Sequence, residues 1–277
     1  MENIYLLLGI GFLIGTLGTL IGAGGGFILV PLLLLVRPDL SPEVITAISM
    51  AVVACNAISG SIAYIASKRV DYKAGLIFAA CTIPGSILGV LTTKIIPRHL
   101  FDLIFGILLI ILAVFLFFKG GKEKDRLMLT EGKKGWVTQH ITDKHGESYI
   151  YSYDIRKGAL LSVLVGYFSP LLGIGGGIIH VPAMVEWLLF PVHIATATSH
   201  FILAIMSTVS VIVHIINGSY NDPAIQRMVI CLAIGVVIGA QLGAYLSHHM
   251  KGKIIIKALA VSLGIVGVRI LLIGLKM

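Results

Sequence analysis

Charged residues are scarce in this chain of 277 residues: Asp, Glu, Lys and Arg make up 12% of it, against about 25% in soluble globular domains. Hydrophobic residues make up 57%, and the mean hydropathy is +0.99. These values exclude an ordinary soluble protein and predict a polytopic, all-α membrane protein. The excess of 21 Lys and Arg over 13 Asp and Glu is then typical of cytoplasmic loops, and no nucleic-acid partner is expected.

Cysteines and membrane-embedded acids are also few. The three cysteines, Cys55, Cys81 and Cys231, lie in apolar segments, so neither a disulfide framework nor a zinc site is predicted. All thirteen Asp and Glu fall in loops or near the ends of apolar segments, whereas a transported metal cation would require buried carboxylates. No paired acids, metal-spaced His and Cys cluster or nucleophile motif occurs. We therefore expect no cofactor, no metal, no enzymatic activity, and an anionic or neutral substrate.

A ten-residue Gly-rich stretch occurs twice, as Gly22–Pro31 (GAGGGFILVP) and Gly173–Pro182 (GIGGGIIHVP). The copies begin 151 residues apart, which indicates a duplication. Gly costs about 1 kcal/mol and Pro about 3 kcal/mol relative to Ala in a helix interior, so each copy predicts a helix break. The apolar run 4–36 would extend about 50 Å as one helix, while a bilayer core is about 30 Å thick. The first break is thus expected within the membrane, where unwound backbone must be buried or line a cavity.

Apolar runs between charged or turn-forming clusters predict about eight membrane segments. Their ranges are 4–36, 43–67, 72–96 and 99–118, followed by 158–190, 192–217, 223–247 and 254–275. The first segment lacks the basic flank of a cleavable signal peptide, so we expect it to be retained. Matches at an offset of 150, such as Ala47–Ser49 with Ala197–Ser199 and Gly85 with Gly235, support two pseudosymmetric four-segment repeats. The first segment of each repeat is broken at the Gly-rich stretch.

A polar region separates the two halves. We divide the chain into a first transmembrane repeat, a polar linker and a second transmembrane repeat, at residues 1–119, 120–156 and 157–277. Trp136–Thr142 and Glu147–Ile155 alternate around a turn, which predicts a β-hairpin. We favour a solvated cytoplasmic linker over a regulatory or partner-binding flap. Broken segments that double back would make the repeats inverted, straight ones would make them parallel, and the loop charges favour inversion.

The paired Gly-Gly-Gly-x-x-x-x-Pro motifs, the Ala-x-Ser positions after them and the eight segments resemble the sulfite exporter TauE/SafE family of membrane transporters. The resemblance covers nearly the whole chain. It implies an eight-helix permease of the bacterial or archaeal plasma membrane. It also implies the transport of sulfur-containing anions such as sulfite, sulfoacetate and other small organosulfonates, and an efflux direction rests on it alone.

The residues themselves also favour an anion site. Unwound glycines present several N–H groups in one concavity, and a following half-helix adds its positive end. We expect Pro31 and Pro182 in the first turn of that half-helix. Glycines that only allow close helix packing are the alternative. The candidate ligands in the breaks are Gly24, Gly25, Gly26, Gly175, Gly176 and Gly177.

Polar residues at midmembrane depth complete the candidate site: Ser49, Asn56, Thr198, Ser199, His200 and Gln241. A Ser or Thr in a membrane helix often bonds its own backbone instead. His200 could bind the anion when protonated and carry a coupled proton, and a neutral packing role is the alternative.

The sequence therefore predicts a secondary transporter that exports a small sulfur-containing anion across the plasma membrane by alternating access. The lipid bilayer and the anion are its expected partners, and a coupling proton or ion remains open. An anion channel and a membrane scaffold acting through the central loop are the rival hypotheses.

Overall fold

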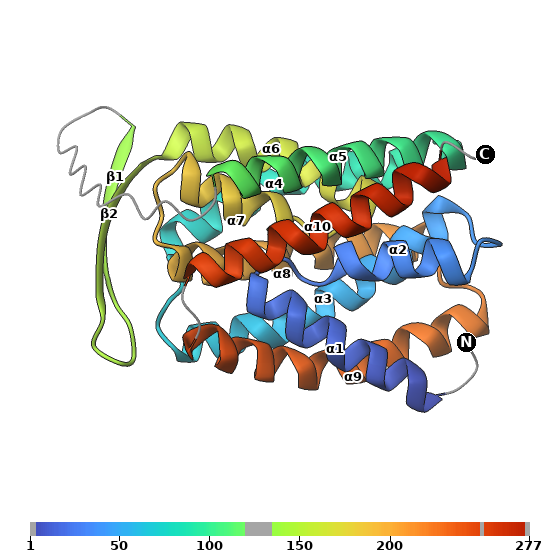
Figure 1. Ribbon diagram of the computed structural model, residues 1–277, viewed down its shortest axis with the longest axis horizontal. Coiled ribbons are helices and arrows are strands. Elements are labelled where there is room, and N and C mark those ends of the chain that lie inside the picture. The colour runs from blue at the N-terminus through green and yellow to red at the C-terminus, as the bar shows by residue number, and fades with distance from the viewer. Residues whose placement is uncertain (1–3, 120–134, 250–251, 275–277) are drawn as a thin grey trace.

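The computed structural model describes residues 4–119, 135–249 and 252–274. Its long helices run roughly along the long axis of the molecule (Figure 1). Six are long and apolar enough to cross a membrane, which confirms the polytopic membrane class. They are α1 (Ile4–Ile21), α3 (Pro42–Ala66), α4 (Tyr72–Thr93), α6 (Ile155–Leu172), α8 (Val192–Ile216) and α9 (Pro223–His249). Helices α5 (Arg98–Lys119) and α10 (Gly252–Gly274) coincide with the other two predicted segments.

Helix breaks occur at both Gly-rich stretches. After α1 the chain restarts as α2 (Gly26–Val36), and after α6 it restarts as α7 (Gly177–Glu186). In each case the short helix turns back along the long one. Gly25 packs against Ile14, and 151 positions later Gly176 packs against Val165. Helix α2 therefore runs back toward the end of the molecule where α1 begins, and α7 toward the end where α6 begins (Figure 1).

The prediction that Pro31 and Pro182 lie in the first turn of the half-helices is wrong. Both lie inside α2 and α7, in the second turn. The reason is that Gly26 and Gly177 already begin the helices, five residues before each proline. Each proline therefore removes a hydrogen bond within its helix and leaves a carbonyl one turn earlier without that donor.

Side-chain caps fix where three of the long helices begin. Ser41 accepts a hydrogen bond from the N–H of Val44 at the start of α3. Asp71 caps α4, and Asp154 caps α6. Such caps satisfy N–H groups that have no partner within the helix.

The first helix of each half packs on a helix of the other half. Gly11 and Gly15 of α1 lie against the backbone of α9 at Leu232 and Val236. Helices α4 and α6 meet in the same way, through Gly85, Gly89 and Gly166. Because small residues let helix backbones approach closely, the two halves interlock rather than lie apart.

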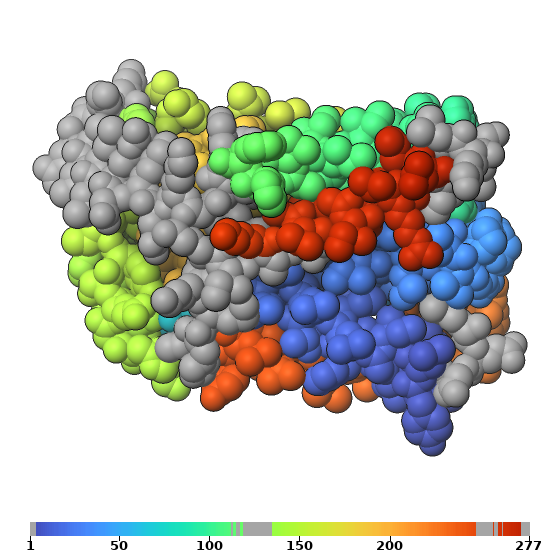
Figure 2. All heavy atoms as spheres, viewed as in Figure 1, coloured from blue at the N-terminus to red at the C-terminus, as the bar shows by residue number. Residues whose placement is uncertain are grey.

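Apolar side chains cover the outside of the helices. Figure 2 shows α5, α10 and α1 on one face of the molecule. Large hydrophobic side chains are exposed on all three, including Ile111 of α5, Ile265 of α10 and Leu13 of α1. An apolar exterior of this kind is stable against lipid and not against water.

A β-hairpin lies beside one end of the helices (Figure 1). Strand β1 (Trp136–Thr142) pairs antiparallel with β2 (Ser148–Asp154), and Trp136 lies opposite Asp154. Helix α6 follows β2 without an intervening loop. Helix α1 begins and α10 ends at the opposite end of the molecule. We call the two ends the hairpin end and the termini end.

The interlock predicts a difference between two neighbouring glycines of α1. A Cβ at Gly11 would overlap the Leu232 carbonyl, whereas a Cβ at Gly9 would have no atom within 4 Å. We expect Gly11→Ala to destabilise the purified protein by about 1–3 kcal/mol through overpacking. Gly9→Ala is the matched control and is expected to be neutral or slightly stabilising. Thermal unfolding in detergent measures both, and equal melting temperatures would contradict the interlock.

Candidate functional site

The two Gly-rich breaks meet in the centre of the molecule. Gly26 packs against the carbonyl of Gly173, and Gly177 packs against the carbonyl of Gly22. Since positions 22 and 26 correspond to positions 173 and 177 at the offset of 151, the two contacts are reciprocal. A side chain at Gly26 or Gly177 would overlap the opposing backbone. Glycine is therefore required on both sides of this contact.

Each break presents a helix N-terminus to the protein interior. Gly25 and Gly176 are the N-caps of α2 and α7, and neither helix has a side-chain cap. Gly25 has a left-handed backbone with φ 84°, whereas Gly176 is right-handed with φ −55°. The first N–H groups of a helix have no partner in the preceding turn, and they carry the positive end of the helix dipole. Two partial positive charges thus lie in the buried centre.

Two matched serines lie beside the breaks and differ in their contacts. Ser49 Oγ donates a hydrogen bond of 2.6 Å to the carbonyl of Gly173. The equivalent Ser199 is fully buried, and its Oγ has no hydrogen-bond partner among the described residues. Ser49 therefore holds the second break in place, while Ser199 keeps an unused hydroxyl.

A buried polar cluster joins α1, α3 and α8 next to the first break. Thr19 Oγ1 donates to Asn56 Oδ1 at 2.7 Å and lies 3.2 Å from His200 Nε2. The Tyr64 hydroxyl donates to the Thr19 carbonyl at 2.8 Å. Asn56 Nδ2 and His200 Nδ1 are buried and have no hydrogen-bond partner within the described ranges, although the His200 ring lies beside the Gly22 backbone. Two nitrogen atoms of the cluster, one on Asn56 and one on His200, are therefore available to bind a ligand.

The other half of the molecule has no such cluster at the matching positions. Thr19 corresponds to Pro170 at the offset of 151, and at the offset of 150 Asn56 corresponds to Met206 and His200 to Met50. Met50 and Met206 are fully buried and belong to one hydrophobic cluster. The polar cluster beside the first break thus has apolar counterparts at these positions. The second break has a different buried polar pair beside it, in which Ser162 Oγ and His180 Nε2 are 3.2 Å apart.

The two other candidate residues make contacts elsewhere. Thr198 Oγ1 accepts a hydrogen bond of 3.0 Å from the N–H of Asp71, at the start of α4. Gln241 Nε2 donates at 2.8 Å to the carbonyl and hydroxyl of Ser59 and so ties α9 to α3. Sequence reasoning missed Thr19 and Tyr64. Thr19 could have been found, because it is the last polar residue before the first break in an apolar run.

A sequence model of the sulfite exporter TauE/SafE family matches residues 7–270. The chain belongs to this family. It is 33% identical to "Probable membrane transporter protein YunE" of Bacillus subtilis over 98% of both chains. A probable membrane transporter protein of Methanocaldococcus jannaschii is 26% identical over 96% of this chain and 95% of its own. A probable membrane transporter protein of Xylella fastidiosa is 24% identical over 91% of this chain and 88% of its own. No solved structure matches the chain.

Membership and the six apolar helices make this TauE/SafE protein a multi-pass membrane transporter of the cell membrane. Its family consists of transporters and not of enzymes.

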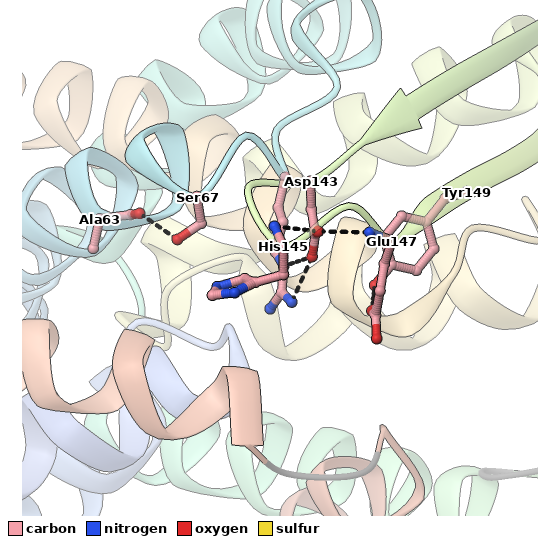
Figure 3. A network of polar contacts seen from close by, with 7 residues as sticks. Ala63, Ser67, Asp143, His145, Glu147 and Tyr149 are labelled. Atoms are coloured by element: carbon pink, nitrogen blue, oxygen red, sulfur yellow. Dashed lines mark hydrogen bonds and ion pairs between the residues drawn. The ribbon is translucent and has the colours of Figure 1, made fainter.

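In this TauE/SafE protein the hairpin turn docks on the α3–α4 turn through a buried ion pair. Asp143 Oδ2 accepts hydrogen bonds of 2.8 and 3.1 Å from the Arg69 guanidinium, and the two side chains are 3% and 0% exposed. Asp143 Oδ1 accepts from the N–H groups of His145 and Glu147 (Figure 3). Burial alone would raise the pKa of Asp143, but these hydrogen bonds lower the pKa below its ordinary value. The carboxylate thus organises the turn and anchors it.

A second set of contacts links the hairpin to α4 and α8. The Tyr151 hydroxyl donates to Asp71 Oδ2 at 2.8 Å. Tyr151 and Tyr153 each pack on Phe190, with ring centroids 4.7 Å apart, and Phe190 lies just before α8. The inner face of the hairpin is therefore buried against the helices.

We expect Arg69→Met to destabilise this TauE/SafE protein by about 3–5 kcal/mol, because it leaves a buried carboxylate without its partner. The matched control is Arg37→Met. Arg37 pairs with Asp39 at 2.7 Å, but its side chain is partly exposed and that of Asp39 is exposed, so the cost should be about 0–1 kcal/mol. Thermal unfolding distinguishes the two variants, and equal shifts in melting temperature would contradict the ion pair's role.

The contribution of the Arg69–Asp143 pair to the free energy of unfolding should be present at neutral pH and lost as the pH falls below about 4, because the folded-state pKa of Asp143 is lowered.

Proposed function

We propose that this TauE/SafE protein is a secondary transporter that exports sulfur-containing anions, sulfite or small organosulfonates, by alternating access around a site at the meeting point of the two breaks. The observation that carries the proposal is the pair of helix N-termini without side-chain caps, at Gly25 and Gly176. A helix N-terminus stabilises an anion by about 0.3–1 kcal/mol, and by up to about 2 kcal/mol when partly buried. The N–H groups of Gly25, Gly26 and Gly175–Gly177 are the proposed ligands. The N–H of Gly24, which the sequence also suggested, already donates to the carbonyl of Gly18 at 3.1 Å.

The distribution of acids favours an anion over a cation. Among the described residues, the buried carboxylates belong to Asp71, Asp102 and Asp143. All three lie in loops or near the start of α5, and each is bonded to neighbouring groups. A cation site would need carboxylates near the breaks. Two helix N-termini without a nearby carboxylate favour negative charge instead.

The Thr19–Asn56–His200 cluster and the hydrophobic cluster of Met50 and Met206 suit an anion with oxygen atoms at one end. We place the sulfonate or sulfite oxygens against Asn56 Nδ2 and the unused Ser199 hydroxyl. The thioethers of Met50 and Met206 adapt to irregular shapes, so they can accommodate a short carbon chain.

Proton coupling is assigned to His200. Thr19 donates its hydroxyl hydrogen to Asn56, so the Nε2–H of His200 is the donor to Thr19, and Nδ1 keeps a lone pair. A proton on Nδ1 would create one more donor and a positive charge beside the first break. Proton and anion would then bind together, which lowers the cost of burying either charge alone.

We further propose that α5 and α10 also cross the membrane, which gives eight spans in two inverted repeats. The opposite starting ends of α1 and α6 and the reciprocal contacts of Gly26 and Gly177 support this arrangement. Inverted repeats supply two equivalent conformations that open the same site to opposite sides of the membrane. The tightly packed centre favours a carrier over an open channel.

Ligand-dependent thermal stability tests the proposed anion. The purified protein is heated with sulfite, sulfoacetate, methanesulfonate, acetate, chloride or zinc. We expect selective stabilisation by sulfur anions, because a ligand at 100 times its Kd stabilises by about 2.7 kcal/mol. A shift with zinc and none with any sulfur anion would overturn the proposal.

Gly176→Ala should raise the Kd for the sulfur anion at least tenfold, since its methyl group would lie at the N-terminus of α7. Gly264→Ala, where the new methyl group meets only Ala113 at 3.6 Å, is the matched control.

A second variant tests the polar side of the site. Asn56→Met introduces the residue that the chain already carries at the matching position 206, so we expect the fold to be retained. Loss of the Nδ2 donor should lower anion affinity about tenfold or more, since a hydrogen bond to a charged group contributes about 1.5–3 kcal/mol. Calorimetric titration with sulfoacetate measures the change. Met228→Leu, a buried substitution in α9, is the control, and equal affinities of the two variants would exclude Asn56 from the site.

A further inference from the structure

We propose that the β-hairpin is a latch that holds the hairpin end of the molecule closed and must release for substrate to pass. This inference rests on the proposed function, because alternating access requires each end to open in turn. At that end the hairpin contacts helices of both halves.

The first part of the latch is polar and binds the first half. Asp143 forms the buried ion pair with Arg69. The N–H of Lys144 donates a hydrogen bond of 3.1 Å to the carbonyl of Ser67, just after α3. Figure 3 shows the hairpin turn beside the end of α3, where Ser67 bonds back to Ala63. The turn is therefore fixed to α3 by backbone and side-chain bonds together.

The second part is aromatic and binds helices of both halves. Tyr151 and Tyr153 pack on Phe190 before α8, and Tyr153 also packs on Phe78 of α4, with ring centroids 6.1 Å apart. Strand β2 passes directly into α6 through the cap of Asp154. Ends of α3, α4, α6 and α8 are thus held to one hairpin.

A short chain of contacts connects the latch to the site. Tyr151 bonds the carboxylate of Asp71, and the N–H of Asp71 bonds Thr198. Ser199 and His200, the next residues of α8, are candidate ligands of the anion. When the hairpin is docked, the segment of α8 that carries these ligands is therefore tied to the α3–α4 turn.

The termini end lacks a matching device among the described residues. There the α8–α9 turn is tied to α3 by hydrogen bonds from Tyr220 to the Ala47 carbonyl at 2.7 Å and from Ser219 to Glu43 at 3.0 Å. Tyr220 also packs against the hydrophobic core, but no ion pair between described residues joins this turn to α3. Ser219 corresponds to Arg69 at the offset of 150. Two ends that are related by the repeat therefore differ in strength, and the hairpin end is the more firmly closed.

A reversible cross-link tests the latch. Ser67→Cys and Lys144→Cys, in a chain whose three native cysteines are replaced by alanine, place two thiols across the backbone hydrogen bond. That contact should bring the Cα atoms within the roughly 4.4–6.8 Å of a disulfide, and mass spectrometry verifies the bond. Transport of sulfoacetate is measured in proteoliposomes, because sulfite itself would cleave the disulfide. We expect oxidation to lower transport at least tenfold and a reductant to restore it.

The matched control is Thr142→Cys with Ser148→Cys. These residues face each other across the hairpin, so their disulfide joins the strands without tying them to the helices. Oxidation of this pair should leave transport unchanged. Full transport by the Ser67–Lys144 cross-linked protein would overturn the latch and leave the proposed function intact.

A second readout does not need a transported substrate. Ser199→Cys places a thiol at the candidate site, and its reaction with a charged maleimide from the hairpin side is timed. We expect Arg69→Met to speed labelling at least tenfold and the Ser67–Lys144 cross-link to prevent it. Equal labelling rates in all three forms would overturn the latch. If the reduced protein does not transport sulfoacetate, the proposed substrate fails, and the labelling rates alone decide on the latch.

Discussion

The close contact of two glycine backbones is the constraint on which the rest of the structure depends. Gly26 and Gly177 each lie against a carbonyl of the opposite break, and any side chain there would separate the two halves. Because the breaks approach so closely, the helix N-termini at Gly25 and Gly176 share one buried region. Side chains of α3 and α8, namely Val53, Leu203 and Met206, pack against the breaks in that region.

The two Gly-rich stretches turn the chain back in the same way but differ in the chemistry around them. Both copies turn back at the same position, as the contacts of Gly25 with Ile14 and of Gly176 with Val165 indicate. The side chains around them diverge, with an asparagine where the other half has a methionine. In the proposed site, the two half-helix N-termini would hold the negative charge, and the unequal side chains around them would orient the anion.

Local signals in the sequence predicted much of the fold. Apolar runs and triple glycines indicated the helices and their breaks, and alternation around Asp143–Gly146 indicated the hairpin, because each of these depends on neighbouring residues. Contacts between distant residues could not be predicted. The Arg69–Asp143 pair spans 74 residues, and Ser49 reaches Gly173 across 124. The position of Pro31 was misjudged, because Gly26 was assumed to be unwound and instead begins α2.

Under the proposed latch, the direct passage from β2 into α6 would give the hairpin a mechanical role. Asp154 ends the strand and caps the helix, so there is no slack between them, and a shift of the hairpin must rotate or pull α6. Any force applied to the hairpin from the aqueous phase would be delivered to the helix that carries the second break. In the proposed carrier, conditions on the side of the membrane that holds the hairpin would then shift the balance between the two conformations of the empty protein, whereas conditions on the other side would not act through the hairpin. Net flux would still follow the electrochemical gradients of the solutes.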